Sequence, residues 1–148
     1  MGDLPSAVLF ACTMNAVRSP MAEGILKFLH GTRIYVDSVG VRSTEVDGFA
    51  IAVMDEIGID ISGHKSKTFD DLEDSYFDLI IPMSPEAQHR AVEMTRVMAV
   101  EIEFWNTFDP SVIDPDDRDA RLAAYRQVRD QLMERIEARF PRALAVDT

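Results

Sequence analysis

The sequence predicts an α/β domain in which a parallel sheet is covered by helices on both faces. Short apolar runs alternate with longer amphipathic runs along the chain, and the run at 77–83 is apolar almost throughout. Alternating strands and helices are joined by right-handed crossovers, and a continuously apolar strand is typical of the centre of a parallel sheet. A length of 148 residues suits one hydrophobic core, so we expect residues 1–148 to form a single domain.

Each element follows from a local pattern. Strands are predicted where β-branched and other apolar residues cluster, at 7–11, 33–39, 77–83 and 97–104. Helices are predicted from the spacing of apolar residues or from start signals, at 19–30, 47–57, 69–74, from 84 onward, and at 117–140. Gly31, Gly40 and Gly58 stand where three of these elements end, and residues 59–67 are expected to be irregular.

The stretch between the first strand and the first helix concentrates chemical groups. Residues 12–20, Cys-Thr-Met-Asn-Ala-Val-Arg-Ser-Pro, contain the only cysteine of the chain, and Arg18 follows it after five intervening residues. A thiol must ionise to attack, and backbone N–H groups at a helix N-terminus together with a guanidinium favour the thiolate. The same groups bind phosphate, and the arginine fork can hold two of its oxygens. We therefore predict attack of the Cys12 thiolate on a tetrahedral oxyanion. The alternative is a buried core cysteine, which leaves Arg18 and the polar loop unexplained.

Polar residues also stand at the ends of the other predicted strands. Ser38 ends the second strand and Ser84 follows the third, as Cys12 follows the first. Ligands of open parallel sheets bind at the carboxyl ends of the strands, so three separate segments are expected to converge on one site.

Composition argues against several classes of function. A net charge of −11 disfavours affinity for nucleic acid or anionic membranes, and no apolar run reaches the roughly 20 residues that a membrane helix needs. The single cysteine forbids an internal disulfide, so nothing points to an oxidising compartment and we expect a cytoplasmic protein. Three scattered histidines form no zinc pattern with it, and the aspartates at 114–119 lack the glycine of a calcium loop. We expect no metal and no cofactor.

The segment from Val8 to Glu23, VLFACTMNAVRSPMAE, resembles the signature of the low-molecular-weight protein tyrosine phosphatases, which the arsenate reductases of the same fold share. Later motifs extend the resemblance over nearly the whole chain. It implies the strand order 2-1-3-4, a phosphate-binding loop after the first strand, and Cys12 as the nucleophile that forms a phosphocysteine. The residues expected to bind the phosphate are Thr13, Met14, Asn15, Ala16, Val17, Arg18 and Ser19.

The leaving oxygen of a phosphate ester needs a proton, and a carboxylic acid is the usual donor. Asp109-Pro110 and Asp114-Pro115 stand between the last strand and the last helix, where the resembled family places its general acid. Residues 105–110 are similar to the version in the arsenate-reductase branch, so we predict Asp109 as the acid. Asp114 is the alternative, and both pairs could also be turn formers without a catalytic role.

Asn15, Ser19, Ser38 and His64 match family positions that form a hydrogen-bond network under the loop. A loop that aims many N–H groups inward needs unusual backbone angles, and Asn tolerates positive φ better than most residues. We therefore expect Asn15 at positive φ, with Ser38 and His64 holding its side chain. Ser19 is expected either to cap the first helix or to donate its hydroxyl to Cys12. The alternative for His64 is a histidine in a surface loop.

Two positions depart from the family. Val17 stands where many of these phosphatases carry a second cysteine, and Ser84 stands where thioredoxin-linked arsenate reductases carry a resolving cysteine. A reductase with an intramolecular disulfide relay is thereby excluded, because the relay needs further cysteines. The tyrosines that often line the phosphatase substrate mouth are not evident either.

The main hypothesis from the sequence is a metal-free phosphatase for phosphate monoesters, with protein phosphotyrosine as the expected substrate. Cys12 would attack phosphorus, Arg18 would stabilise the transition state and Asp109 would protonate the leaving group. The alternative is an arsenate reductase that uses an external thiol such as glutathione or mycothiol, for which Cys12 suffices. A non-catalytic phosphate-binding module is the third hypothesis. The expected partners are a phosphorylated protein or a small phosphate ester, or arsenate with a thiol, and the sequence leaves the oligomeric state open.

Overall fold

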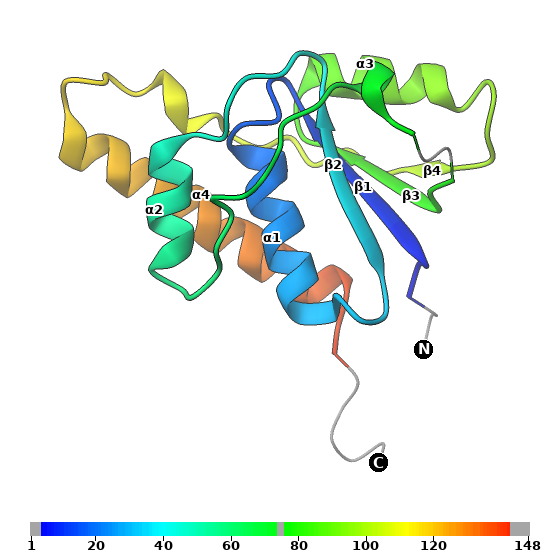
Figure 1. Cartoon of the computed structure of the whole chain (residues 1–148), viewed down its shortest axis with the longest axis horizontal. Helices are drawn as coiled ribbons and strands as arrows, with labels where there is room; N and C mark the ends of the chain where they lie inside the picture. Colours follow the sequence, from blue (N-terminus) through cyan, green and yellow to red (C-terminus); the bar gives the residue numbers. More distant parts are fainter. Residues whose placement is uncertain (1–3, 74–75, 143–148) are drawn as a thin grey trace.

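A four-stranded parallel sheet forms the centre of the protein. The computed structural model describes residues 4–73 and 76–142. The strands follow one another across the sheet in the order β2-β1-β3-β4, and all three pairs are parallel (Figure 1). Their bounds are Ala7–Cys12 for β1, Tyr35–Gly40 for β2, Leu79–Pro82 for β3 and Glu101–Ile102 for β4. The predicted fold class and strand order are confirmed.

Helices cover both faces of this sheet. Helix α3 lies on one face, and α1, α2 and α4 lie on the other (Figure 1). The α-helices are α1 (Arg18–His30), α2 (Gly48–Asp55), α3 (Pro85–Met94) and α4 (Arg118–Arg139), and two short 3₁₀ turns are η1 (Phe69–Asp71) and η2 (Pro110–Val112). Within the described ranges, none of the helices is both long and apolar enough to cross a membrane.

Strand β1 is buried along its whole length because it has a neighbour on either side and helices above and below. Successive side chains of a strand point to opposite faces. Val8, Phe10 and Cys12 accordingly pack in the core beneath α1 and α4, whereas Leu9 packs in the core beneath α3. The alternation places the Cys12 thiol on the side of the sheet from which α1 starts.

Several predicted boundaries were wrong. The fourth strand covers only Glu101–Ile102 of the predicted 97–104, because only two residues pair regularly with β3 at this sheet edge. Helix α2 is shorter than 47–57. Asp47 is its N-cap and accepts from the amides of the first turn, and Glu56 is its C-cap. Of the predicted short helix at 69–74, a single 3₁₀ turn is present, and residue 74 lies outside the described residues.

The chain continues beside β3 after β4 ends, and this positions the segment that holds Asp109. The amides of Glu103, Trp105 and Thr107 donate to the carbonyl oxygens of Ile80, Pro82 and Met83 over 2.9–3.1 Å. The loop is thereby drawn along the sheet edge to the carboxyl ends of β1 and β3.

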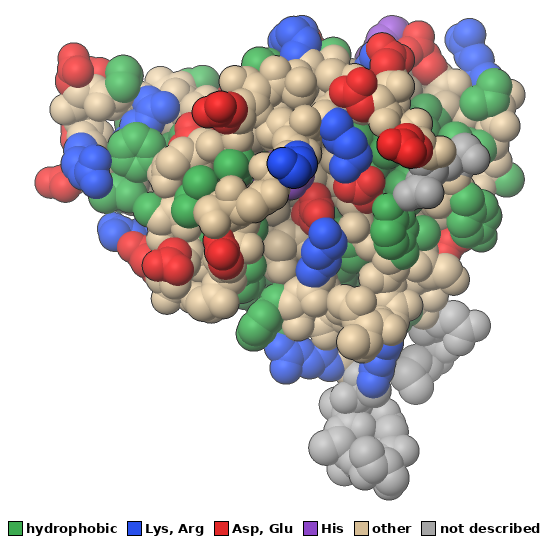
Figure 2. Space-filling view, viewed as in Figure 1, with side chains coloured by type: hydrophobic (Ala, Val, Ile, Leu, Met, Phe, Trp, Pro, Cys, Tyr) green, Lys and Arg blue, Asp and Glu red, His purple; other side chains and the backbone are tan. Residues whose placement is uncertain are grey.

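Acidic and basic side chains are interspersed on the face shown in Figure 2, without a broad basic area.

Candidate active site

The loop at 13–17 turns its carbonyl groups away from its centre. The carbonyl oxygens of Thr13, Met14 and Ala16 accept from the amides of Arg42, Thr44 and Asp47, and that of Asn15 accepts from the Ser66 hydroxyl at 2.7 Å. A tight loop whose carbonyls point outward directs its N–H groups inward. These N–H groups and the N-terminus of α1 together form a concave site suited to an anion.

Asn15 fixes the shape of this loop. Its φ of 53° is the only positive value at a non-glycine among the described residues. The side-chain amide donates to the hydroxyls of Ser19 and Ser38, both at 2.9 Å, and its oxygen accepts from His64 Nε2 at 3.0 Å and from the Lys67 amide at 2.9 Å. All four hydrogen bonds that a buried Asn side chain can make are present, so the expected positive φ and its two expected partners are found.

A chain of hydrogen bonds connects His64 to the thiol. Since Asn15 Oδ1 is an acceptor, His64 carries its proton on Nε2. Ser19 Oγ accepts from Asn15 and can donate its own proton to Cys12 Sγ at 2.9 Å, with the Val39 carbonyl as a more distant acceptor at 3.4 Å. Burial lowers the pKa of His64, although the nearby Glu23 carboxylate acts in the opposite direction. The lowered pKa favours the neutral imidazole at neutral pH, and its Nε2–H donates to the Asn15 side chain.

The structure decides between the two roles expected for Ser19, capping of the first helix and hydrogen bonding to Cys12. Helix α1 begins at Arg18 with Val17 at the N-cap, and no side chain caps it. The capping alternative for Ser19 is therefore wrong, and the contact with the thiol is present.

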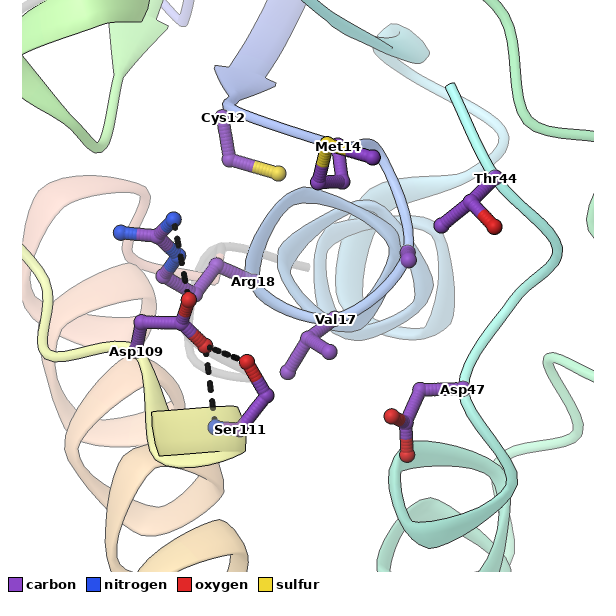
Figure 3. A pocket seen from close by; sticks show the side chains of 9 residues that line it. Cys12, Met14, Val17, Arg18, Thr44, Asp47, Asp109 and Ser111 are labelled. Carbon is purple, nitrogen blue, oxygen red and sulfur yellow. Dashed lines mark hydrogen bonds and ion pairs between the residues drawn. The ribbon is translucent and has the colours of Figure 1, made fainter. Parts of the chain in front are cut away.

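Arg18 and Asp109 face each other across a small pocket (Figure 3). The Arg18 guanidinium donates to the carbonyl of Thr107 at 3.0 Å and lies 3.8 Å from Asp109 Oδ2. The other Asp109 oxygen accepts from the amide and the hydroxyl of Ser111, so the carboxylate is held in place. The pocket has a volume of about 130 Å³, and its lining includes Cys12, Arg18 and Asp109. A pocket of this size has room for a tetrahedral oxyanion.

The other candidate residues lie around this pocket or away from it. Ser84 caps α3 and accepts from the Thr13 hydroxyl at 3.0 Å, so the predicted convergence of strand ends is confirmed. Asp114 is exposed and accepts from the Asp116 amide, and it does not line the pocket. The N-cap of α4 is Asp117. Asp114 therefore does not cap this helix.

Comparison with known proteins identifies the family. The model of the low molecular weight phosphotyrosine protein phosphatases matches residues 7–147. The chain belongs to this family. The glutaredoxin arsenate reductase of Synechocystis sp. is 35% identical over 130 residues, which are 88% of this chain and 92% of that protein.

Two solved structures extend the comparison. An arsenate reductase in the oxidized state has a TM-score of 0.72 and 32% identity, covering 90% of this chain and 95% of that one. The arginine phosphatase YwlE of Geobacillus stearothermophilus has a TM-score of 0.73 and 25% identity, covering 90% of this chain and 89% of that one. This member of the low molecular weight phosphatase family is accordingly a cysteine-based enzyme, and its similar proteins include both reductases and phosphatases.

Sequence reasoning missed two contributions to the site of this phosphatase-family member. Glu23 is buried, accepts from the Ser38 hydroxyl, lies 3.7 Å from His64 Nδ1 and pairs with Lys27. Its position one helical turn after Ser19 is the signal that points to it, because residues four apart share a helix face. The Thr107 carbonyl that holds Arg18 had no such signal, since any residue type supplies a main-chain oxygen.

Proposed function

We propose that this protein reduces arsenate to arsenite and takes both electrons from external thiols. The observation that carries the proposal is the combination of an oxyanion-sized pocket with a single thiol in the whole chain, Cys12. The similar arsenate reductases, which the chain matches over most of its length, support arsenate as the oxyanion.

The first step is the same for arsenate and for a phosphate ester. The Cys12 thiolate attacks the central atom while Arg18 and the inward N–H groups of the loop hold the oxygens. Asp109 gives a proton to the departing oxygen, and a Cys12–S–As(V) adduct forms with loss of water. The Ser19 hydroxyl, oriented by Asn15, stabilises the thiolate before attack.

The second step needs a thiol from outside the chain. An external thiolate attacks Cys12 Sγ, an S–S bond forms, and the electron pair of the S–As bond stays on arsenic, which leaves as arsenite. A second thiol then releases the mixed disulfide and restores the Cys12 thiolate. One arsenate and two thiols thus give one arsenite, one disulfide and one water. Ser84, on the Thr13 side of the loop, cannot replace the external thiol, because a hydroxyl forms no disulfide.

Hydrolysis of phosphate monoesters, the main hypothesis from the sequence, is now the second candidate. The position of Asp109 favours it, since its carboxylate lines the pocket and lies 3.8 Å from Arg18, where a leaving oxygen would need a proton. The difference lies in the second nucleophile, which is water activated by Asp109 for the phosphatase and a thiol for the reductase.

The two candidates are separated by measuring both reactions with the same protein. We expect arsenite formation from arsenate that depends on added glutathione and yields one disulfide per arsenite. Release of p-nitrophenol from its phosphate ester, without thiol, is expected to be much slower. The Cys12→Ser variant is expected to lose both reactions. Rapid ester hydrolysis without arsenite formation would transfer the assignment to a phosphatase, and binding of arsenate without either reaction would indicate a non-catalytic module.

A further inference from the structure

A second cavity adjoins the active-site pocket. It is an open groove of about 450 Å³ between α2 and the start of α4, and Asp47 lines both cavities. The groove is lined further by Gly48, Phe49 and Ala52 from α2 and by Arg118, Arg121 and Leu122 from α4. The end of the molecule where α4 begins carries basic, acidic and hydrophobic side chains beside one another (Figure 2).

Two guanidinium groups share one aromatic ring in this groove. The guanidinium carbons of Arg118 and Arg121 lie 5.5 and 5.3 Å from the centre of the Phe49 ring. Arg121 donates to the Ile113 carbonyl at 2.6 Å, but its buried Nε has no partner among the described residues. In the described part of the chain, neither arginine forms an ion pair with a carboxylate. Two like charges on one ring repel each other, and an anion between them would relieve this repulsion.

The surroundings make this pair of arginines unusual. Both residues stand in the first turn of α4, where the helix dipole disfavours cations, and the chain carries a net charge of −11. The nearest acid of the lining, Asp47, accepts from the Phe49 and Ala50 amides and from the Tyr125 hydroxyl at 3.0 Å. Burial and Asp47 both raise the pKa of Tyr125, so its hydroxyl keeps the proton that it donates. Asp47 is thus occupied within the fold. Arg121 also forms a hydrogen bond with Tyr125, so Arg118 is the guanidinium that remains more available to a ligand.

We propose that this groove binds the carboxylate of the external thiol and thereby selects a thiol of the glutathione class, a small peptide thiol with carboxylates, over uncharged thiols. This inference rests on the proposed reductase function. A guanidinium matches the two oxygens of a carboxylate, and the Phe49 ring supports the aliphatic part of the ligand. Because Asp47 lines both cavities, the groove adjoins the pocket that contains Cys12, and we expect a thiol anchored there to extend its sulfur toward that pocket.

The anchored thiol performs the second step of the reaction. Its sulfur, as thiolate, attacks Cys12 Sγ of the arsenic adduct, the S–S bond forms and the S–As bond breaks with its electron pair on arsenic. Arsenite leaves through the pocket. A second molecule of the same thiol then attacks the mixed disulfide, so that the disulfide of the thiol and the Cys12 thiolate are the products.

Arg118→Gln tests the groove with the full-length protein. Arg118 is preferred to Arg121 because Arg121 also holds the main chain at Ile113. Arsenite formation is measured with glutathione and with 2-mercaptoethanol, and thiol preference is the ratio of the two kcat/KM values. We expect this preference to fall about tenfold, through a higher KM for glutathione, because a charge-assisted hydrogen bond is lost. Arg96→Gln, the same change of charge at an exposed position after α3, is the matched control and keeps the preference of the wild type.

A binding measurement separates failure of the groove from failure of the proposed function. S-Methylglutathione cannot react, so its dissociation constant, measured by calorimetry, does not depend on catalysis. We expect binding to weaken about tenfold in Arg118→Gln and to stay the same in Arg96→Gln. If no thiol supports arsenite formation, the reductase function fails and this binding result alone decides on the groove. If arsenite forms but the thiol preference and the binding are the same in Arg118→Gln and wild type, the groove proposal is overturned while the reductase stands. Binding of an acidic phosphopeptide in place of S-methylglutathione would also overturn it.

Discussion

Replacing Asn15 tests whether one side chain holds the oxyanion loop in its active shape. In Asn15→Gly, the His64 Nε2–H and the Lys67 amide lose their common acceptor, and each unsatisfied buried donor costs about 1–3 kcal/mol. We therefore expect the free energy of unfolding to fall by about 2–6 kcal/mol. Asn15→Ala suffers the same loss and adds the left-handed penalty of roughly 1–2 kcal/mol at the φ of 53°.

The alanine variant is therefore expected to be the less stable of the two. The glycine variant loses more backbone entropy on folding than the alanine variant, which costs it roughly 0.5–1 kcal/mol of stability. This cost offsets part of the advantage that glycine gains from the absence of strain. The remaining difference is about 0–1.5 kcal/mol in favour of glycine, with a mid-range value of about 0.75 kcal/mol. Urea unfolding, followed by the fluorescence of the buried Trp105, measures both variants. Asn106, the only other asparagine of the chain, is exposed and lacks a positive φ, so glycine there has no such advantage over alanine. An Asn15→Ala variant as stable as Asn15→Gly would refute the reasoning.

Three further predictions concern single ionisable groups. Asp109→Asn is expected to lower kcat for the oxyanion substrate by about 10²–10⁴-fold, whereas Asp114→Asn leaves kcat nearly unchanged, and the reverse pattern would move the acid to Asp114. An NMR titration is expected to give His64 an imidazole pKa below its usual 6.5 because the side chain is buried. The unfolded chain then binds the proton more tightly, so the contribution of His64 to stability falls as pH drops below about 6.5, and a pKa above that value would contradict this. Hydrogen bonds from Arg126 and Arg129 lower the pKa of Glu56 from 4.5 to about 2, so its contribution to stability is complete above about pH 4.5 and is lost as pH falls toward 2. Acid unfolding of Glu56→Gln is therefore expected to lack this part of the stability loss, and identical acid profiles would contradict it.

The sequence was sufficient to predict an element or a site residue where one local pattern dominates. The apolar runs of β1 and β3 predict central strands because both faces are buried, and Cys12 follows directly from the end of β1. The outer strand β4 was overestimated, since an edge strand receives pairing from one side only and Val97 is exposed. In this region the same pattern of apolar residues is compatible with a strand and with an exposed loop, so the sequence does not distinguish them.

Contacts between segments distant in sequence were harder to predict. The network around Asn15 was expected through the family resemblance, but Glu23 was missed although its helical spacing from Ser19 pointed to it. The groove at Phe49 joins α2 to α4, and no local pattern connects residues about seventy positions apart. Such a site becomes visible only once the packing of the two helices is known.

The central claim is that Cys12 forms the covalent bond to the oxyanion and is then released by an external thiol. Mass spectrometry of the protein, quenched during turnover with arsenate and limiting glutathione, measures this directly. We expect a glutathione mixed disulfide on the peptide that contains Cys12, formed only when arsenate is present and in step with the appearance of arsenite. Arsenite production without any modification of Cys12, or undiminished production by Cys12→Ser, would contradict the account.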